Sequence, residues 1–204
     1  YAKHATTYGI NVENPSANFG GVITRSRGVA DKMSKGIQFL MKKNKIDVIM
    51  GTGKLIAATK MEVTAADGTK QIVEAKNIII ATGGRARALP TMPIDGKKIV
   101  GYREAMVLPE QPRSMIVCGS GAIGSEFAYF YNSMGTKVTM VEFMPRLVPV
   151  EDEDISKELE KNFKKQGMTI MTSSEVLSVD TSGAGVKAKV KTPTGEVTLE
   201  ADIL

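Results

Sequence analysis

A glycine-rich turn between two short apolar runs constrains the fold of this chain more than any other feature. Residues 115–118 form an apolar run of the length expected for a buried parallel strand, and residues 119–124 follow at once with the pattern G-x-G-x-x-G. Residues 126–131 are typical of a helix, and residues 137–141 form a second apolar run. We therefore predict a strand, a glycine turn, a helix and a second strand over residues 114–142, with the two strands parallel and adjacent.

Each glycine of this turn has a mechanical role in binding a dinucleotide. Gly119 permits the tight turn out of the strand, Gly121 allows the backbone to approach a pyrophosphate, and Gly124 allows the helix to pack closely on the sheet. The helix N-terminus presents free N–H groups and a partial positive charge to phosphate oxygens. Glycine turns also occur where a strand merely packs on a helix, but here all the elements follow in the order of a dinucleotide site.

An acidic residue, Glu142, ends the second strand and predicts which dinucleotide is bound. It lies about 20 residues beyond the glycine turn, where an acid commonly accepts hydrogen bonds from the adenosine ribose. A carboxylate suits a free 2′-hydroxyl and repels a 2′-phosphate, so the sequence favours NAD(H) over NADP(H). Arg146 is the one nearby cation that would complicate this choice, but it follows Pro145 and lies beyond the end of the strand.

The composition is that of an ordinary globular protein and excludes several classes of function. Charged residues make up 24% and hydrophobic residues 42% of the 204 residues, which is enough for a sizeable core. No apolar run approaches the ~20 residues of a membrane span. The net charge of +5 comes from lysines scattered among acids, and aromatic residues are only 5%, so the pattern does not indicate nucleic-acid binding. A single cysteine excludes an internal disulfide framework and is typical of the cytoplasm.

The first half of the chain predicts one long helix and several strands. We expect a loop over residues 1–18 and an amphipathic helix over residues 21–44, whose apolar positions recur at helical spacing. Residues 46–50 and 77–81 are short apolar runs typical of buried strands. Between them, the dipeptide Asp67-Gly68 predicts a hairpin. The paired strands of that hairpin are expected at Met61–Ala65 and Gln71–Ala75.

The second half begins after a proline-rich connector, residues 89–113, which predicts a domain boundary near residues 105–113. A helix is expected over residues 151–167, and we assign the acids at its start to helix capping rather than to a metal site. Residues 168–172 predict a third apolar strand. A further series of strands is expected at 175–180, 186–191 and 197–199.

The order of these motifs resembles that of the flavoprotein disulfide reductases that bind two dinucleotides, and among them the dihydrolipoamide dehydrogenases. The stretches that carry the resemblance are Gly51-Thr52-Gly53-Lys54, Ile79-Ile80-Ala81-Thr82-Gly83, Leu89-Pro90, Gly119 to Glu126, Val141-Glu142-Phe143 and Val148-Pro149. The resemblance covers nearly all of this chain but only the middle of such an enzyme. We therefore expect the chain to be an internal part of a longer protein.

This resemblance implies the fold class and the cofactors. The fold would be α/β, with part of an FAD-binding domain in residues 1–107 and a Rossmann-like NAD-binding domain, truncated at its C-terminal end, in residues 108–204. The second domain would contain a parallel sheet and an antiparallel β-meander. The implied FAD-site residues are Gly53, Thr82, Gly83 and Gly84. The implied NAD-site residues are Gly119, Ser120, Gly121, Ala122, Ile123, Gly124, Ser125, Glu126, Glu142 and Val176.

The resemblance also implies a reaction and its partners. The parent enzyme would oxidise dihydrolipoamide through a disulfide and FAD and pass a hydride to NAD⁺. Its partners would be the subunits of a 2-oxo acid dehydrogenase complex, whose lipoyl domain carries the substrate, and a second copy of itself in a homodimer. Neither nucleic acid nor a membrane is expected as a partner.

The chain departs from the family in its catalytic parts. It has neither the first G-x-G-x-x-G with the Cys-x-x-x-x-Cys pair nor the His–Glu pair of that family. Cys118 is expected in the core and His4 on the surface, so we predict no catalytic residue and no metal ligand. The chain alone is expected to be inactive, to hold FAD weakly or not at all, and to leave apolar surface uncovered in its first half.

Two other functions stay open on the sequence. One is a related enzyme, such as a mercuric reductase, an NADH oxidase or another disulfide reductase, since these enzymes differ mainly in the segments that this chain lacks. Glutathione reductase is disfavoured because Glu142 opposes NADPH. The other is a nucleotide-binding module without catalysis.

Overall fold

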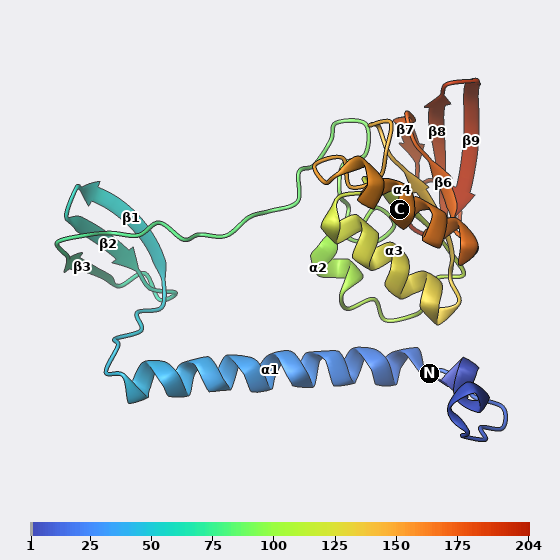
Figure 1. Ribbon diagram of the computed structural model, residues 1–204. Helices are drawn as coiled ribbons and strands as arrows, with labels where there is room; N and C mark the ends of the chain where they lie inside the picture. The colour runs from blue at the N-terminus through green and yellow to red at the C-terminus, as the bar shows by residue number, and fades with distance from the viewer. Residues whose placement is uncertain (1) are drawn as a thin grey trace. The chain divides into compact units, whose positions relative to one another are not determined.

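The computed structural model describes residues 2–204, with side-chain environments from His4 onward (Figure 1). The chain forms two compact units, of which the larger comprises the residues up to Thr24 together with Ala86–Leu204, and the smaller comprises Arg25–Arg85. Helix α1, Phe19–Lys43, begins in the larger unit and continues into the smaller one. Compactness does not report which cofactor a segment binds, so the assignment of residues 1–107 and 108–204 to two cofactor domains stays a prediction.

A parallel sheet lies at the centre of the larger unit. Its strands are β4, Ser114–Cys118, β5, Lys137–Val141, and β6, Thr169–Met171, in the order β4-β5-β6. Helix α3, Ala122–Met134, connects β4 to β5 and ends at Gly135, whose φ of 104° is the left-handed conformation that glycine adopts readily. The predicted strand, turn, helix and parallel strand are therefore confirmed.

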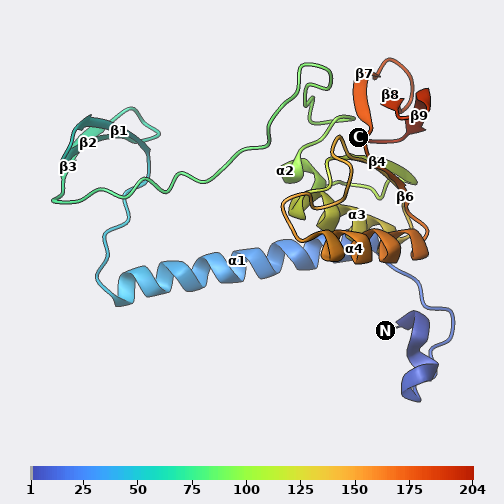
Figure 2. The same cartoon turned by 45° about the horizontal axis from the view of Figure 1, so that its top comes forward.

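Helices cover one face of this sheet, and an antiparallel sheet covers the other (Figure 2). Alternate strand residues point to opposite faces. Met115, Val117 and Met140 pack in the core that also contains α3 and α4, Glu153–Lys165. Ile116 and Val141 pack in a second core with the antiparallel sheet. This two-sided burial is the reason that the strands read as continuous apolar runs.

The antiparallel sheet is a three-stranded meander. Its strands are β7, Glu175–Asp180, β8, Val186–Thr192, and β9, Gly195–Ala201, in the order β7-β8-β9. Buried and exposed residues alternate along β8, as expected for a strand with one covered face. The predicted series of strands is confirmed.

The proline-rich connector packs into the larger unit rather than lying outside it. Met92 and Ile99 are buried in the core beneath the meander. The short helix α2, Tyr102–Ala105, is fixed by Tyr131 of α3, whose buried hydroxyl donates a hydrogen bond of 2.6 Å to the Ala105 carbonyl. At the start of α1, Phe19 packs against Phe130 and Tyr131, with ring centroids 6.4 and 6.0 Å apart.

The smaller unit contains an antiparallel sheet that includes the predicted hairpin. Its strands are β1, Thr52–Ala57, β2, Lys60–Thr64, and β3, Lys70–Glu74, in the order β1-β2-β3. The hairpin turn is held by Asp67 Oδ1, which accepts a 2.9 Å hydrogen bond from the Thr69 N–H. Strand β1 was not expected from the sequence, and it contains Gly53, a residue type that is depleted in strands.

Several expectations for the first half are wrong. Residues 46–50 and 77–81 form no strand in the part of the chain that the structure describes, because no neighbouring strand offers them hydrogen bonds. Residues Ala2–Tyr8 form a 3-10 helix, η1, where a loop was expected, while Tyr1 lies outside the described residues. The amphipathic α1 is confirmed, but its apolar positions Met33 and Ile37 are exposed.

The prediction that the first half leaves apolar surface uncovered is confirmed by these residues and by the exposed Ile79 and Ile80. Across residues 2–204, none of the helices combines the length and apolar character that a bilayer span requires.

Candidate dinucleotide-binding site

The glycine turn lies at the carboxyl end of β4, and its backbone conformation and packing require glycine at two positions. Gly119 has a φ of +96°, and its N–H donates a 2.9 Å hydrogen bond to the Val141 carbonyl at the end of β5. A Cβ atom on Gly124 would lie 2.1 Å from the Gly119 carbonyl oxygen, so helix α3 approaches the turn closely only because Gly124 has no side chain. A Cβ on Gly121 would meet nothing within 4 Å. The open side of the turn is therefore at Gly121, where the sequence predicts the pyrophosphate.

The N-terminus of α3 opens beside Gly121. Gly121 is the N-cap, with extended φ and ψ of −62° and 178°, and it has no side chain that can accept a hydrogen bond from the first helical turn. Ala122, Ile123 and Glu126 of that first part of the helix are exposed. The first N–H groups of a helix have no intrahelical partner and carry a partial positive charge. This arrangement can bind an anionic ligand such as a pyrophosphate.

Glu142 faces the glycine turn and is buried, with 7% of its surface exposed. Its Oε2 accepts two hydrogen bonds from Ser120, one from the N–H and one from the hydroxyl, each 2.7 Å long. Its Oε1 accepts a 2.7 Å hydrogen bond from the Met144 N–H. An ionised carboxylate has about four lone-pair sites, so one acceptor site remains on Oε1. The predicted contact of Glu142 with a ribose depends on that site and stays a prediction.

Ser120 joins three parts of the site. It is fully buried, and its carbonyl accepts hydrogen bonds of 3.0 Å from the Val148 N–H and from the Ser125 hydroxyl. Its N–H and hydroxyl both donate to Glu142. The turn is thus connected to α3, to the end of β5 and to residues 143–150, which we call the 143–150 loop.

The 143–150 loop is held by hydrogen bonds from one of its own side chains to nearby backbone carbonyls. The guanidinium of Arg146 donates hydrogen bonds of 3.0 Å to the Pro149 carbonyl and 3.5 Å to the Glu151 carbonyl. Leu147 is fully buried in the core with α3 and α4. Arg146 thereby holds the backbone of this loop, and the expectation that it does not govern the choice of cofactor stays a prediction.

Cys118 is exposed, which corrects the expectation that it lies in the core. It is the last residue of β4, where the sheet ends. Protein atoms still crowd the thiol on one side, and this desolvation, with the nearby Glu142 carboxylate as a smaller cause, raises the pKa of Cys118 from 9.0 to about 11. The thiol is therefore a poor nucleophile at neutral pH.

The remaining predicted site residues lie elsewhere. Gly53 is in β1, and Thr82, Gly83 and Gly84 follow the extended segment 77–81, where all three are exposed; these four residues belong to the smaller unit. Val176 of β7 is buried in the core beneath the meander, so its side chain is used in packing. The predicted FAD-site residues belong to the smaller unit and the predicted NAD-site residues to the larger one.

The sheet order also identifies the carboxyl end of β4 as a ligand-binding position. Ile203, after β9, forms a parallel bridge with Met115, on the side of β4 opposite to β5. The chain therefore continues to one side of β4 through β5 and β6 and returns to its other side. In open α/β sheets, ligands bind outside the carboxyl ends of the strands at such a reversal.

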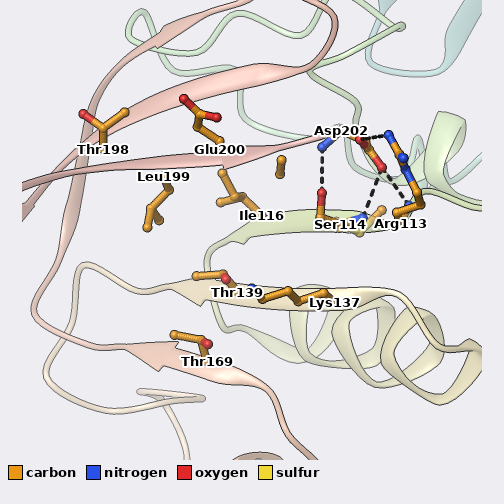
Figure 3. Close-up of a pocket in the computed structure, with 12 residues that line it drawn as sticks. Arg113, Ser114, Ile116, Lys137, Thr139, Thr169, Thr198, Leu199, Glu200 and Asp202 are labelled. Atoms are coloured by element: carbon orange, nitrogen blue, oxygen red, sulfur yellow. Dashed lines mark hydrogen bonds and ion pairs between the residues drawn. The ribbon is translucent and has the colours of Figure 1, made fainter.

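A cleft of about 670 Å³ lies at the opposite ends of the same strands (Figure 3). It is lined by Ser114, Lys137 and Thr169, the first residues of β4, β5 and β6, and by residues of β9. Asp202 at its rim accepts hydrogen bonds from the Arg113 and Ser114 N–H groups at 2.8 and 3.2 Å. These contacts hold the segment after β9 against the start of β4. The cleft is at the amino ends of the strands, whereas the glycine turn is at the carboxyl end of β4.

Within residues 2–204, no group of three or more His, Cys, Asp or Glu side chains is arranged to hold a metal ion. His4, the only histidine of the chain, is exposed on η1.

The comparisons with known proteins agree with this geometry. A profile of the pyridine nucleotide-disulphide oxidoreductases matches residues 3–204. The chain belongs to this family. Its members are flavoprotein oxidoreductases that use FAD and a pyridine nucleotide, and the predicted resemblance is confirmed.

Curated relatives in the family include dihydrolipoyl dehydrogenases. That of Chlorobaculum tepidum is 44% identical over 189 residues, which are 93% of this chain and 40% of the relative. That of Zymomonas mobilis is 41% identical over 198 residues, 97% of this chain and 42% of the relative. Leghemoglobin reductase of Vigna unguiculata is 35% identical over an alignment of 206 positions, which covers 100% of this chain and 39% of the relative. The chain thus spans about 40% of the length of these relatives.

Solved structures show the same fold. LpdA from Mycobacterium tuberculosis superimposes with a TM-score of 0.86 at 30% identity, covering 98% of this chain and 44% of that one. The flavoprotein disulfide reductase RclA from Escherichia coli superimposes with a TM-score of 0.79 at 25% identity, covering 92% of this chain and 42% of that one. The predicted α/β fold class, part of an FAD-binding domain with a Rossmann-like NAD-binding domain, is confirmed by this likeness.

Sequence reasoning missed the groups that hold Glu142. The Met144 and Ser120 N–H groups carry no sequence signal, because every residue except proline has a backbone N–H. Ser120 was included in the site only as part of the stretch Gly119 to Glu126 that the resemblance implies, and its hydroxyl was given no role. Val148, whose N–H contacts the Ser120 carbonyl, was noted for the resemblance but not for a contact.

Proposed function

We propose that the glycine turn, the N-terminus of α3 and Glu142 bind NAD(H). The observation that carries the proposal is that one glycine of the turn is tightly packed while another is accessible. Gly124 is in contact with the turn, while Gly121 and the N-terminus of α3 are open to a ligand. A turn that merely packed a strand on a helix would need the first feature and not the second. The three hydrogen bonds that fix Glu142 beside this opening add an acceptor of defined orientation.

NAD(H) is favoured over NADP(H) by the charge of Glu142. A carboxylate accepts a hydrogen bond from a 2′-hydroxyl and repels a 2′-phosphate. Arg146, the cation nearest in sequence, donates to carbonyls of its own loop. A 2′-phosphate would therefore meet an uncompensated negative charge at Glu142.

The proposed parent reaction is the oxidation of protein-bound dihydrolipoamide by NAD⁺ in a flavoprotein of the dihydrolipoyl dehydrogenase type. Hydride transfer between the flavin and the nicotinamide is the chemistry that the cofactors supply when bound. In this chain, the larger unit would hold and orient NAD. Part of the FAD site would be lined by Gly53, Thr82, Gly83 and Gly84. A Cβ atom built on Gly83 or Gly84 would meet nothing within 4 Å, so these two positions are open.

The same proposal covers the setting of the enzyme. Its partners would be the lipoyl domain of a 2-oxo acid dehydrogenase complex and a second subunit of a homodimer, in the cytoplasm. The support is the identity of 41–44% to dihydrolipoyl dehydrogenases. The likeness to RclA at 25% identity supports a second candidate, another flavoprotein disulfide reductase with the same NAD site and a different substrate.

Titration calorimetry of the chain with NADH and NADPH tests the nucleotide site. We expect NADH to bind more tightly than NADPH. Glu142→Ala should weaken NADH binding about ten- to hundredfold and reduce the preference over NADPH, because a hydrogen bond to a charged group is worth about 1.5–3 kcal/mol. Glu158→Ala, which removes an exposed acid of α4, is the matched control and should change neither affinity.

Thermal unfolding must accompany this titration, because Glu142→Ala also leaves the donors of Ser120 and Met144 without their acceptor. If both proteins are folded and bind NADH equally, Glu142 does not hold the ribose.

Flavin content and turnover test the cofactor part of the proposal. This chain has one cysteine and therefore no internal disulfide to accept electrons from a dithiol. We expect the purified chain to lack flavin absorbance and to reduce no NAD⁺ with dihydrolipoamide. A yellow protein with turnover would refute this view of the chain.

A further inference from the structure

We propose that Ser120 is a positioning residue, whose hydroxyl orients the Glu142 carboxylate toward the nucleotide. The inference rests on the proposed NAD(H) site and assigns a role to a side chain within it. Glu142 would contact the ribose, and Ser120 would act through Glu142 without contacting the ribose itself.

The contacts of Ser120 are complete within the protein. Its N–H and hydroxyl donate to Glu142, and its carbonyl accepts from Val148 and Ser125. Because the residue has no exposed surface, its hydroxyl is turned toward Glu142 and away from solvent. A hydroxyl that bound the nucleotide directly would need to face the open side of the turn at Gly121.

The hydrogen bonds on the two carboxylate oxygens of Glu142 are unequal. Oε2 accepts both bonds from Ser120, whereas Oε1 accepts only the bond from the Met144 N–H. With about four lone-pair sites on a carboxylate, the unequal pattern leaves the vacant site on Oε1. Loss of the Ser120 hydroxyl would vacate a second site on Oε2 and release one of three constraints on the orientation of the group. The acceptor offered to the ribose would then be less defined.

The position of Ser120 also links two parts of the nucleotide site. Its backbone lies between Gly119 and Gly121, in the turn predicted to hold the pyrophosphate. Its hydroxyl reaches the residue that ends β5. Ser120 therefore joins the predicted phosphate-binding turn directly to the predicted ribose acceptor. Such preorganisation improves binding because fewer groups must be ordered when the ligand arrives.

A double-mutant cycle on the full chain tests the inference. NADH affinity is measured by calorimetry for the unchanged chain, Ser120→Ala, Glu142→Ala and the double variant. We expect Ser120→Ala to weaken NADH binding about fivefold in the unchanged background, the effect of a typical hydrogen bond. In the Glu142→Ala background, the same substitution should have no further effect, because Ser120 acts only through Glu142.

Ser156→Ala is the matched control. Ser156 is also a buried serine whose hydroxyl contacts a backbone carbonyl, that of Val148 at 3.5 Å, but it lies on α4 and does not contact Glu142. Its removal should leave NADH affinity unchanged in both backgrounds. Ser120→Gly, which keeps the N–H donor and removes the hydroxyl, replaces Ser120→Ala if that variant does not fold.

Thermal unfolding of the same proteins without nucleotide gives a second measurement. Coupling between Ser120 and Glu142 predicts that the double variant is less destabilised than the sum of the single variants. Additive losses of stability, or equal fold-losses of NADH affinity in both backgrounds, would overturn the positioning role. If the unchanged chain does not bind NADH, the proposed nucleotide site fails, and the nucleotide-free cycle still decides whether Ser120 orients Glu142.

Discussion

Two apolar runs of similar composition have opposite structures in the two units. Residues 115–118 form β4 of the larger unit, where Met115 and Ile116 are 4% and 2% exposed. Residues 78–81 of the smaller unit form no strand, and Ile79 and Ile80 are 89% and 68% exposed. Both runs have the pattern of a buried strand, so their side chains do not explain the difference.

Neighbouring elements explain it. β4 exchanges hydrogen bonds with β5 and is covered by α3 on one face and by the meander on the other. Residues 78–81 have no such neighbours within the smaller unit. An apolar run therefore specifies a tendency to be buried, and a strand forms only where a neighbour satisfies its backbone groups.

The largest difference between the units should appear when a buried and an exposed side chain are truncated. Met140→Ala removes a fully buried side chain from the core of the larger unit and should cost about 2–5 kcal/mol of unfolding free energy. Ile79→Ala should change it by less than about 0.5 kcal/mol, because Ile79 is exposed. Urea denaturation of both variants measures the two values. Similar losses would show that residues 78–81 are packed in solution.

The reactivity of a thiol should also differ between the two apolar runs. The pKa of Cys118 is raised from 9.0 to about 11, so less thiolate is present at any pH below that value. At pH 8, its alkylation by iodoacetamide should be about a hundredfold slower than that of an ordinary thiol, since two pKa units change the thiolate fraction about a hundredfold. Ile80→Cys in a Cys118→Ser background provides the exposed comparison in the smaller unit.

The alkylation rate of Cys118 should keep rising up to about pH 11, whereas that of Cys introduced by Ile80→Cys should level off near the ordinary thiol pKa of 9.0. Equal pH profiles for the two thiols would mean that β4 does not desolvate its last residue.

The smallest effects should come from the same substitution in two helices. Gly124→Ala in α3 brings a Cβ to 2.1 Å from the Gly119 oxygen and should cost about 1–3 kcal/mol through overpacking. Gly36→Ala in α1 meets nothing within 4 Å and should stabilise the helix by about 0.5–1 kcal/mol, because alanine has the higher helix propensity. Thermal unfolding followed by circular dichroism measures both. Effects of the same sign would contradict the close approach of α3 to the turn.

Much of the larger unit follows from its sequence. The elements from β4 to β6 and the meander were predicted in order, because each has a local signal, either an apolar run, a helical period or a glycine stop. In the smaller unit the same signals failed at residues 46–50 and 77–81, and β1 was missed. The residues of β1 are exposed, so the strand has no apolar pattern of burial. Its pairing with β2 also involves Gly53, and glycine has no preference for strands.

The site divides in the same way. Gly119, Gly121 and Gly124 were assigned separate roles from spacing alone. The close contact at Gly124 agrees with its packing role, and the pyrophosphate role of Gly121 stays a prediction. The contact of Ser120 with Glu142 was not foreseen, because the two residues are 22 positions apart and their meeting requires β4 and β5 to be adjacent and in register.

The sequence by itself determined the family, the order of the elements around the glycine turn and the acid at the end of β5. These depend on residue type and short-range spacing, which are present in the chain before it folds. Only the tertiary structure decided that Glu142 is buried and held by three donors, that Cys118 is exposed, and that two apolar runs of the smaller unit form no strand. Burial and hydrogen-bond partners are properties of neighbours far away in sequence, and an apolar run or an acid is compatible with several sets of neighbours.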